Sequence, residues 1–104
     1  IVDGDPVSVA SKINELCIES LKQGKKVGIL ASKQTLNMYK HGIVLDLGDR
    51  DVPITIAASL FDRLREFDDL GVDIIFAEGV GEDNIGLAIM NRMKKAAGYN
   101  VIHV

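Results

Sequence analysis

The stretch SLFDRLREFDDLGVDIIFAEG, residues 59–79, decides how this chain of 104 residues folds. In this stretch, and just before it, apolar side chains recur at helical spacing, which predicts an amphipathic helix that Gly71 ends. The strand VDIIFAEG (72–79) follows at once and shows no clean alternation of apolar and polar residues, so we expect both of its faces to be covered. The apolar stripe of the helix comprises Ile56, Leu60, Phe61, Leu64, Phe67 and Leu70.

Strands and helices alternate along the rest of the chain as well. This strict alternation, with short apolar strands, predicts an α/β domain in three layers: a mostly parallel sheet of about five strands with helices on both faces. The elements that we expect outside 49–79 are a first strand end at 1–3, a helix from Asp5 to Gly24, a strand at 26–31, a brief helix at 33–40 capped by Ser32, a strand at 42–48, a helix from Gly86 to Gly98 and a strand at 100–104.

Composition limits the classes of function. Apolar residues make up 47% of the chain, which is enough for a core, and the net charge of -3 provides no general attraction for nucleic acid. The single cysteine, Cys17, excludes an internal disulfide framework and fits a reducing cytoplasm. No apolar run reaches the length of a membrane span. The chain begins at Ile1 without a methionine, which predicts a fragment of a longer polypeptide, cut inside a strand.

Standard catalytic and cofactor motifs do not occur in the sequence. No strand is followed by G-x-G-x-x-G, and there is no G-x-x-x-x-G-K-[ST] phosphate loop. Paired cysteines, H-E-x-x-H and G-x-S-x-G are also missing, so neither a metal site nor a hydrolase nucleophile is predicted. A phosphoacceptor site of the receiver type lacks both its central aspartate and its lysine after the last strand. We therefore predict no catalytic residue in this chain.

The carboxyl ends of the predicted strands form the candidate ligand edge, because parallel α/β sheets bind ligands there. Ser32 could hold an anion at a helix start, but an ordinary capping serine is the simpler interpretation. Arg50 lies between two aspartates in a loop that by default is solvated. Glu78 and Gly79 lie at the start of the glycine-rich loop AEGVGEDNIG (77–86). This loop either binds a ligand or partner or simply connects two elements, and the residues favour neither interpretation.

The last helix, GLAIMNRMKKAAG (86–98), has an apolar and a polar side. Leu87, Met90, Met93 and Ala97 share the stripe that we expect to face the core. Arg92 and Lys95 lie on the opposite side with Ala88, and Asn91 lies at the border. Asparagine is a mediocre helix former, so Asn91 either makes a specific hydrogen bond or is solvated. The residues alone do not decide between a solvated face and a contact surface.

Several of these segments together resemble one family, the Sua-type C-terminal domain of two-domain threonylcarbamoyl-AMP synthases. Its recurring pattern is a Leu-Gly strand end, A-x-x-L-F-x-x-L-R-x-x-D, D-x-I-x-A-E and G-L-A-I-M-N-R-x-x-K-A-A. The resemblance covers nearly the whole chain, and KKVGILAS (25–32) is similar to the second strand of the family. The matching residues are Leu47-Gly48; Ala57, Leu60, Phe61, Leu64, Arg65 and Asp68; Asp73, Ile75, Ala77 and Glu78; and 86–97.

The resemblance implies a Rossmann-like fold and a role in tRNA modification. Synthases of this family make threonylcarbamoyl-adenylate from L-threonine, bicarbonate and ATP, with Mg, for threonylcarbamoyladenosine in tRNA. That nucleotidyltransferase chemistry, including ATP binding, belongs to an N-terminal YrdC-like domain. The resemblance therefore implies that residues 1–104 are the C-terminal domain alone, without the YrdC-like domain and the linker, and that no cofactor is bound by this domain itself.

For the domain's own role, the resemblance implies docking on the linker and gating of the catalytic domain. Its partners would be that domain and linker in the same polypeptide and, indirectly, the tRNA-modification machinery. No contact with a membrane is expected, and whether the domain contacts nucleic acid directly stays open. The alternatives are an independent nucleotide or small-anion binding module and a purely structural domain. Many members read G-x-G or G-L-G where this chain has 84–86, which weakens an anion-cradling role for that loop. The candidate interface or ligand edge comprises Ser32, Gly48, Arg50, Glu78, Gly79, Gly86, Asn91, Arg92 and Lys95.

Overall fold

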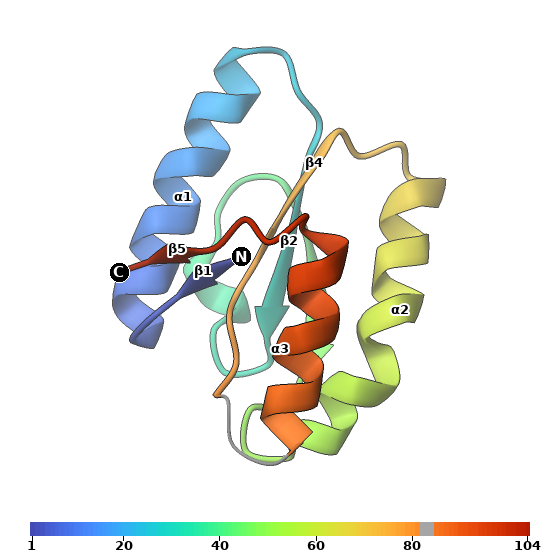
Figure 1. Cartoon of the computed structure of the whole chain (residues 1–104). Helices are drawn as coiled ribbons and strands as arrows, with labels where there is room; N and C mark the ends of the chain where they lie inside the picture. The colour runs from blue at the N-terminus through green and yellow to red at the C-terminus, as the bar shows by residue number, and fades with distance from the viewer. Residues whose placement is uncertain (82–84) are drawn as a thin grey trace.

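The computed structural model describes residues 1–81 and 85–104 and has three helices and five short strands (Figure 1). The predicted α/β alternation is confirmed. In chain order the elements are β1 (Val2–Asp3), α1 (Pro6–Lys22), β2 (Val27–Ser32), the 3₁₀ turn η1 (Leu36–Met38), β3 (Ile43–Gly48), α2 (Pro53–Asp69), β4 (Ile74–Ala77), α3 (Ile85–Ala96) and β5 (Ile102–His103).

All strand pairs are parallel, but the strands form two sheets rather than one. One sheet has the order β3-β2-β4, and the other is the two-residue pair β1-β5. A single bridge between Val2 and Glu78 joins them. Right beside this bridge, the amide of Gly79 donates to the carbonyl of Val2 at 2.8 Å. The carboxyl ends of β2, β3 and β4 thus meet at one edge, as parallel pairing requires.

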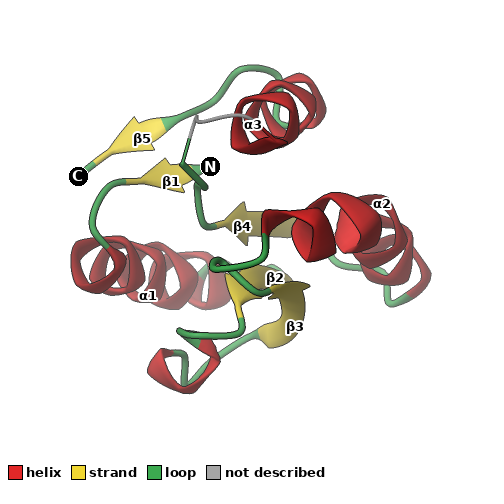
Figure 2. Ribbon diagram, turned by 90° about the horizontal axis from the view of Figure 1, so that it is seen from below, coloured by secondary structure: helices red, strands yellow, loops and turns green. Residues whose placement is uncertain are grey.

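Helices cover both faces of the strands, with α1 on one side and α2 and α3 on the other (Figure 2). The side chain of Asp5 caps α1 by accepting from the amide of Ser8 at 3.0 Å, and Pro6 follows at the first helical position. The core under α1 includes Val9, Ile13, Cys17 and Ile29, and the core under α2 and α3 includes Leu30, Ile56, Leu60, Phe67, Ile89, Met90 and Met93.

Two expectations about apolar stripes are wrong at their margins. Phe61 in α2 and Leu70 at its C-terminal cap are 45% and 40% exposed and Leu87 of α3 is 46% exposed, whereas Leu60 and Met90 are buried. Helix α2 buries Ile56, Leu60 and Phe67. Helix α3 buries Gly86, Ile89, Met90 and Met93. Helices α2 and α3 pack together on one face of the strands (Figure 2), and the exposed side chains lie at the margins of the faces that the two helices bury.

The brief helix predicted at 33–40 is also shorter than expected. Only Leu36–Met38 forms a 3₁₀ turn, and no side chain caps its start. Ser32 ends β2 instead, and its hydroxyl points to a different partner, the carboxylate of Glu78, 3.0 Å away. The Ser32 hydroxyl therefore bonds to a residue distant in sequence and, contrary to the sequence analysis, does not cap a helix.

Candidate functional site

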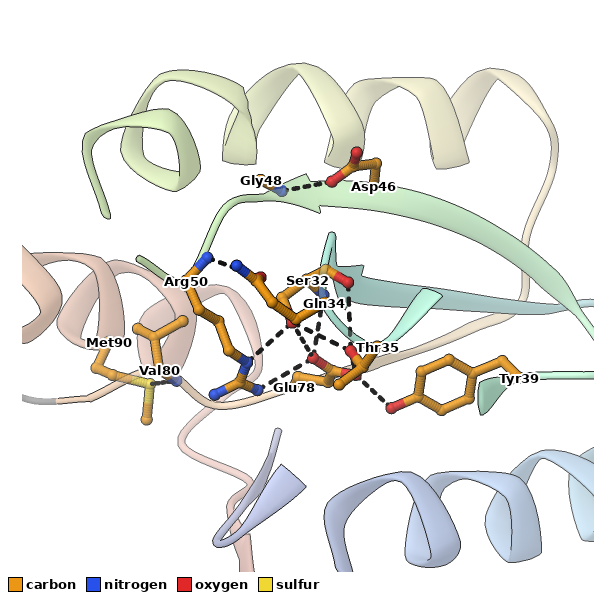
Figure 3. A network of polar contacts seen from close by, with 10 residues as sticks. All are labelled: Ser32, Gln34, Thr35, Tyr39, Asp46, Gly48, Arg50, Glu78, Val80 and Met90. Atoms are coloured by element: carbon orange, nitrogen blue, oxygen red, sulfur yellow. Dashed lines mark hydrogen bonds and ion pairs between the residues drawn. The ribbon is translucent and has the colours of Figure 1, made fainter. Parts of the chain in front are cut away.

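A buried glutamate occupies the carboxyl edge of the three-stranded sheet. Glu78 directly follows β4 and its side chain is 1% exposed. Ser32 reaches it from the end of β2, and Arg50 reaches it from the loop between β3 and α2 (Figure 3). The prediction that parallel strands bring these three positions to one edge is therefore matched by their contacts.

Donors surround both oxygens of the Glu78 carboxylate (Figure 3). Oε1 accepts from the amide and the hydroxyl of Ser32 and from Nη2 of Arg50, each at 3.0 Å. Oε2 lies 2.5 Å from the hydroxyls of Thr35 and Tyr39. In addition, Nε of Arg50 donates to Oγ of Ser32 at 2.8 Å, so the guanidinium is held at two points. We call these five residues the Glu78 cluster.

The charge state of the Glu78 cluster follows from these contacts. Burial by itself would raise the pKa of Glu78, but hydrogen bonds from Thr35, Tyr39, Ser32 and Arg50 outweigh it and hold the pKa below its ordinary value. Burial and then the Glu78 carboxylate raise the pKa of Tyr39, so its hydroxyl remains a donor. An ionised and fully bonded carboxylate is a poor proton acceptor near neutral pH, so the cluster lacks the properties of a general base.

We expect this cluster to make the stability of the chain pH-dependent in the acid range. Because the pKa of Glu78 is lower in the folded state, its contribution is present above the ordinary value of 4.5 and is lost as the pH falls below it. Urea unfolding of the wild type and of Glu78→Gln should show a constant difference in the free energy of unfolding from about pH 7 to about pH 5, and a shrinking difference below that. A difference that is independent of pH would contradict the assignment.

The loop that carries Arg50 is fixed by side chains at its own end of the sheet. Gln34 Oε1 accepts from the amide of Arg50 at 3.0 Å, and Gln34 Nε2 donates to Asp49. Gly48 begins the turn with a φ of 131°, and a Cβ there would lie 2.9 Å from the amide nitrogen of Ile56. A residue other than glycine would therefore push α2 away from the loop.

A small cavity of about 220 Å³ lies beside Arg50, between the start of α2 and the start of α3. Gly86 closes one side so tightly that a Cβ would lie 1.8 Å from the carbonyl oxygen of Gly81. The departure from the family pattern at Asn84 lies outside the described residues. The remaining lining residues are Pro53, Ile56 and Val80.

The polar residues of α3 do not join this edge. Asn91, Arg92 and Lys95 are exposed on the outer side of the helix. The guanidinium carbon of Arg92 lies 5.9 Å from the ring centroid of Phe61 on α2, which is a cation–π distance. The nine candidate residues therefore divide into an edge group, which includes Gly48, Gly79 and Gly86, and a separate outer surface on α3.

Three contributors to the edge were missed by the sequence analysis. Thr35 and Tyr39 are buried and bonded to Glu78, and Gln34 holds the Arg50 loop. All three lie in the segment that was interpreted as a brief helix. Their only signal was a run of hydroxyl and amide side chains directly after a buried strand.

Within residues 1–81 and 85–104, no three or more His, Cys, Asp or Glu side chains gather as a metal site would require. In the same described part, no helix has the length and apolar character needed to cross a membrane.

The fold and the edge define a parallel α/β domain whose strand ends are closed by a buried ionic cluster. Residues 2–98 match the family model for the C-terminal domain of threonylcarbamoyl-AMP synthase. The chain belongs to this family.

Two relatives show how much of such a protein the chain represents. It is 44% identical to the threonylcarbamoyl-AMP synthase of Pyrococcus abyssi over 104 residues, which cover 100% of the chain and 29% of that protein. With the Bacillus subtilis synthase it shares 40% identity over 102 residues, which cover 98% of the chain and 28% of that protein. The chain thus spans less than a third of these relatives.

Solved structures agree with the fold. P. abyssi Sua5 complexed with L-threonine superposes with a TM-score of 0.85 at 42% identity, over 99% of this chain and 29% of that one. The isolated C-terminal Sua5 domain of Pyrococcus horikoshii gives a TM-score of 0.78 at 38% identity, over 99% of this chain and 92% of that one. The second comparison matches this chain to a domain that has been solved on its own.

Proposed function

We propose that this chain is the accessory domain of an L-threonylcarbamoyladenylate synthase and that it docks on the linker and gates the catalytic domain. The parent protein would make threonylcarbamoyl-AMP from L-threonine, bicarbonate and ATP for tRNA modification. One observation carries the proposal: the chain matches the C-terminal domain of such synthases over residues 2–98 while spanning less than a third of their length.

The Glu78 cluster supports an accessory rather than a catalytic role. Each carboxylate oxygen of Glu78 is engaged by donors from the chain itself, and its pKa is lowered rather than raised toward neutrality. Such a group stiffens the strand ends but has no free lone pair with which to take a proton from a substrate.

The outer surface of α3 is the part of the chain that we assign to docking. Asn91, Arg92 and Lys95 lie there in solvent. Arg92 lies over the exposed ring of Phe61, and Leu87 is exposed one helical turn before Asn91. A surface that combines an aromatic ring, an aliphatic side chain and an arginine has the composition of protein interfaces. None of these side chains belongs to the core, so a substitution on this surface can test docking without unfolding the domain.

A small-anion or nucleotide site is the second candidate, and the position of Arg50 favours it. Its side chain is 21% exposed and lies against the cavity of about 220 Å³. Titration of the chain with ATP, AMP and L-threonine distinguishes the two candidates, since only a binding module would respond at millimolar ligand. Loss of that response in Arg50→Ala would place the ligand in this cavity.

The rate of threonylcarbamoyl-adenylate synthesis by the parent protein would test the docking role. Arg92→Glu should lower synthesis at least about tenfold, equivalent to about 1.4 kcal/mol. Its effect on the free energy of unfolding should stay within about 1 kcal/mol, the value of an exposed cation–π contact. A parent that lacks the whole domain should lose at least as much synthesis.

The matched control is Lys22→Glu, the same charge change on an exposed position at the end of α1, in the opposite layer. We expect it to leave synthesis unchanged. Equal effects of Arg92→Glu and Lys22→Glu would remove the α3 surface from the proposal. Unchanged synthesis after removal of the domain would remove the gating role altogether.

A further inference from the structure

Strand β3 is the outermost strand of the three-stranded sheet. The sheet order is β3-β2-β4, so β3 pairs with β2 on one side and, among the strands of the described residues, with none on the other (Figure 2). This free edge lies in the middle of the sequence, along Ile43–Gly48. An unpaired edge exposes amides and carbonyls that can pair with a strand of another molecule.

The hydrogen bonds around β2 show which of its residues face β3. Just after β2, the amide of Lys33 donates to the carbonyl of Gly48 at 2.8 Å. On the other side, the carbonyl of Leu30 accepts from the amide of Glu78, directly after β4, at 3.1 Å. Backbone groups alternate in direction along a strand. The odd-numbered residues of β2 therefore face β3, and the even-numbered residues face β4.

The register then identifies the residues of β3 that face the open side. Ile29 and Ala31 lie opposite Val44 and Asp46. In a parallel pair, a residue that faces its partner strand is bonded to the two neighbours of the residue opposite, and that opposite residue points away. The backbone amides and carbonyls of Val44 and Asp46 therefore form the free edge, which we call the β3 edge.

Helix α2 closes the carboxyl half of the β3 edge. Nε of Arg63 donates to the carbonyl of Asp46 at 2.8 Å, and the hydroxyl of Ser59 lies 2.5 Å from the carbonyl oxygen of Leu47. The register skips Leu47, so a β-bulge bends the strand at the same place. Side chains that cover an edge and bulges that bend it are two of the devices by which proteins keep strand edges from pairing. Both devices act at 46–47, and Val44 lies before them.

We propose that the β3 edge is a surface for strand pairing with a second copy of this chain, and that Arg63 keeps it closed. Two pairing strands need the carbonyl of Asp46 as well as the groups of Val44, because one residue supplies too short a ladder to hold two molecules together. That carbonyl is bonded to Arg63, so pairing requires the guanidinium to leave. Arg63 thus competes with a second chain for the same acceptor, whether or not the domain has the docking role proposed for α3.

The charges along β3 favour a second copy in the antiparallel orientation. Lys40 is exposed just before the strand, and Asp46 lies near its end. When two copies pair about a two-fold axis, the basic start of each strand lies near the acidic end of the other. Opposite charges across a strand pair are favourable, whereas a parallel pair would bring the two Lys40 side chains together. Val44 lies between these charges and would be near the centre of the antiparallel pair.

Removal of the Arg63 guanidinium provides the first test. Residues 1–104 with Arg63→Ala should form dimers at a protein concentration at least about tenfold lower than the wild type, because each copy gains a free carbonyl for the other. Sedimentation equilibrium at several concentrations measures the association, and circular dichroism should show native helix content in the dimer. A variant that associates no more than the wild type, or only with loss of helix content, would overturn the proposal.

Two control variants separate the β3 edge from charge effects. Arg63 also pairs with the Glu66 carboxylate through Nη1 at 3.1 Å, and Glu66→Ala removes this ion pair but leaves the bond from Arg63 to Asp46. Arg65→Ala removes the same charge as Arg63→Ala from an exposed position that pairs with Asp62. Both controls should associate like the wild type. Association of either control as strong as that of Arg63→Ala would contradict the proposal.

Hydrogen exchange locates the contact. In Arg63→Ala, the amide of Val44 should exchange at least about tenfold more slowly at a concentration where dimers prevail than at one where monomers prevail. By the same alternation, the amide of Leu45 points toward β2 in both states, so it serves as the internal control and should change less. Slower exchange of Val44 in the dimer supports pairing through the β3 edge. Equal exchange of Val44 in monomer and dimer would place the contact elsewhere and overturn the proposal.

Discussion

Replacing Glu78 by alanine should lower the free energy of unfolding of this chain by about 3–5 kcal/mol, the range for removing one partner of a buried ion pair. The loss is large because Ser32, Thr35 and Tyr39 are buried, and their donors would lose the carboxylate to which they are bonded. Arg50 would also lose its partner. Equilibrium unfolding in urea measures the change directly.

The control for this prediction is Glu66→Ala on α2. The Glu66 carboxylate pairs with Arg63 at 3.1 Å, but its side chain is 45% exposed. Exposed pairs contribute about 0–1 kcal/mol, so this variant should unfold almost like the wild type. Glu78→Gln separates charge from volume, and we expect it to fall between the two. If Glu78→Ala and Glu66→Ala were equally stable, the Glu78 cluster would have no structural role.

The sequence predicted the parts of the fold that depend on alternation and burial. The run from 72 to 79 lacks a polar face, and the structure covers β4 with β2 at its side and with side chains of α2 and α3. Parallel order then brings Ser32, Arg50 and Glu78 to one edge without any local motif. The rule that parallel strands place their carboxyl ends at one edge of the sheet was sufficient to predict this grouping.

The parts that the sequence did not predict depend on angles and contacts that spacing does not encode. Phe61 and Leu87 lie at the margins of broad apolar stripes, and a small rotation of each helix decides whether such a position is buried. Thr35 and Tyr39 lie in an irregular segment where no period exists to be recognised. The two-residue strands β1 and β5 are too short for the sequence to show that they would form a sheet of their own.

The resemblance and the geometry give different weight to the two groups of candidate residues. The closing motif draws attention to Asn91 and Arg92, which are exposed and separate from the sheet edge. Glu78 ends a shorter motif, yet it has the most contacts of any charged side chain at the edge (Figure 3). We interpret the first group as a surface for the parent protein and the second as the support that holds the strand ends in place.

Phe67→Ala should be the other strongly destabilising substitution, with a loss of about 3–5 kcal/mol in the free energy of unfolding. Phe67 is 0% exposed, and its ring packs on the bare backbone of β2, where a Cβ on Gly28 would lie 2.6 Å from a ring carbon. The same change at Phe61 tests the assignment of helix faces. That ring is 45% exposed, so Phe61→Ala should cost no more than about 1.5 kcal/mol.

A second substitution shows whether the contact between Phe67 and Gly28 is the reason for the loss. In the wild type, Gly28→Ala should destabilise the chain by about 1–3 kcal/mol, because the added methyl group meets the ring. In Phe67→Ala the ring is gone, so the same methyl group enters the cavity and should cost nothing or restore some stability. The two substitutions should therefore be non-additive by at least about 1 kcal/mol, whereas Gly28→Ala and Phe61→Ala should add. Additive losses for Gly28→Ala and Phe67→Ala would mean that α2 is not seated on β2 through this contact, and the position of the Arg50 loop at the start of α2 would then need another explanation.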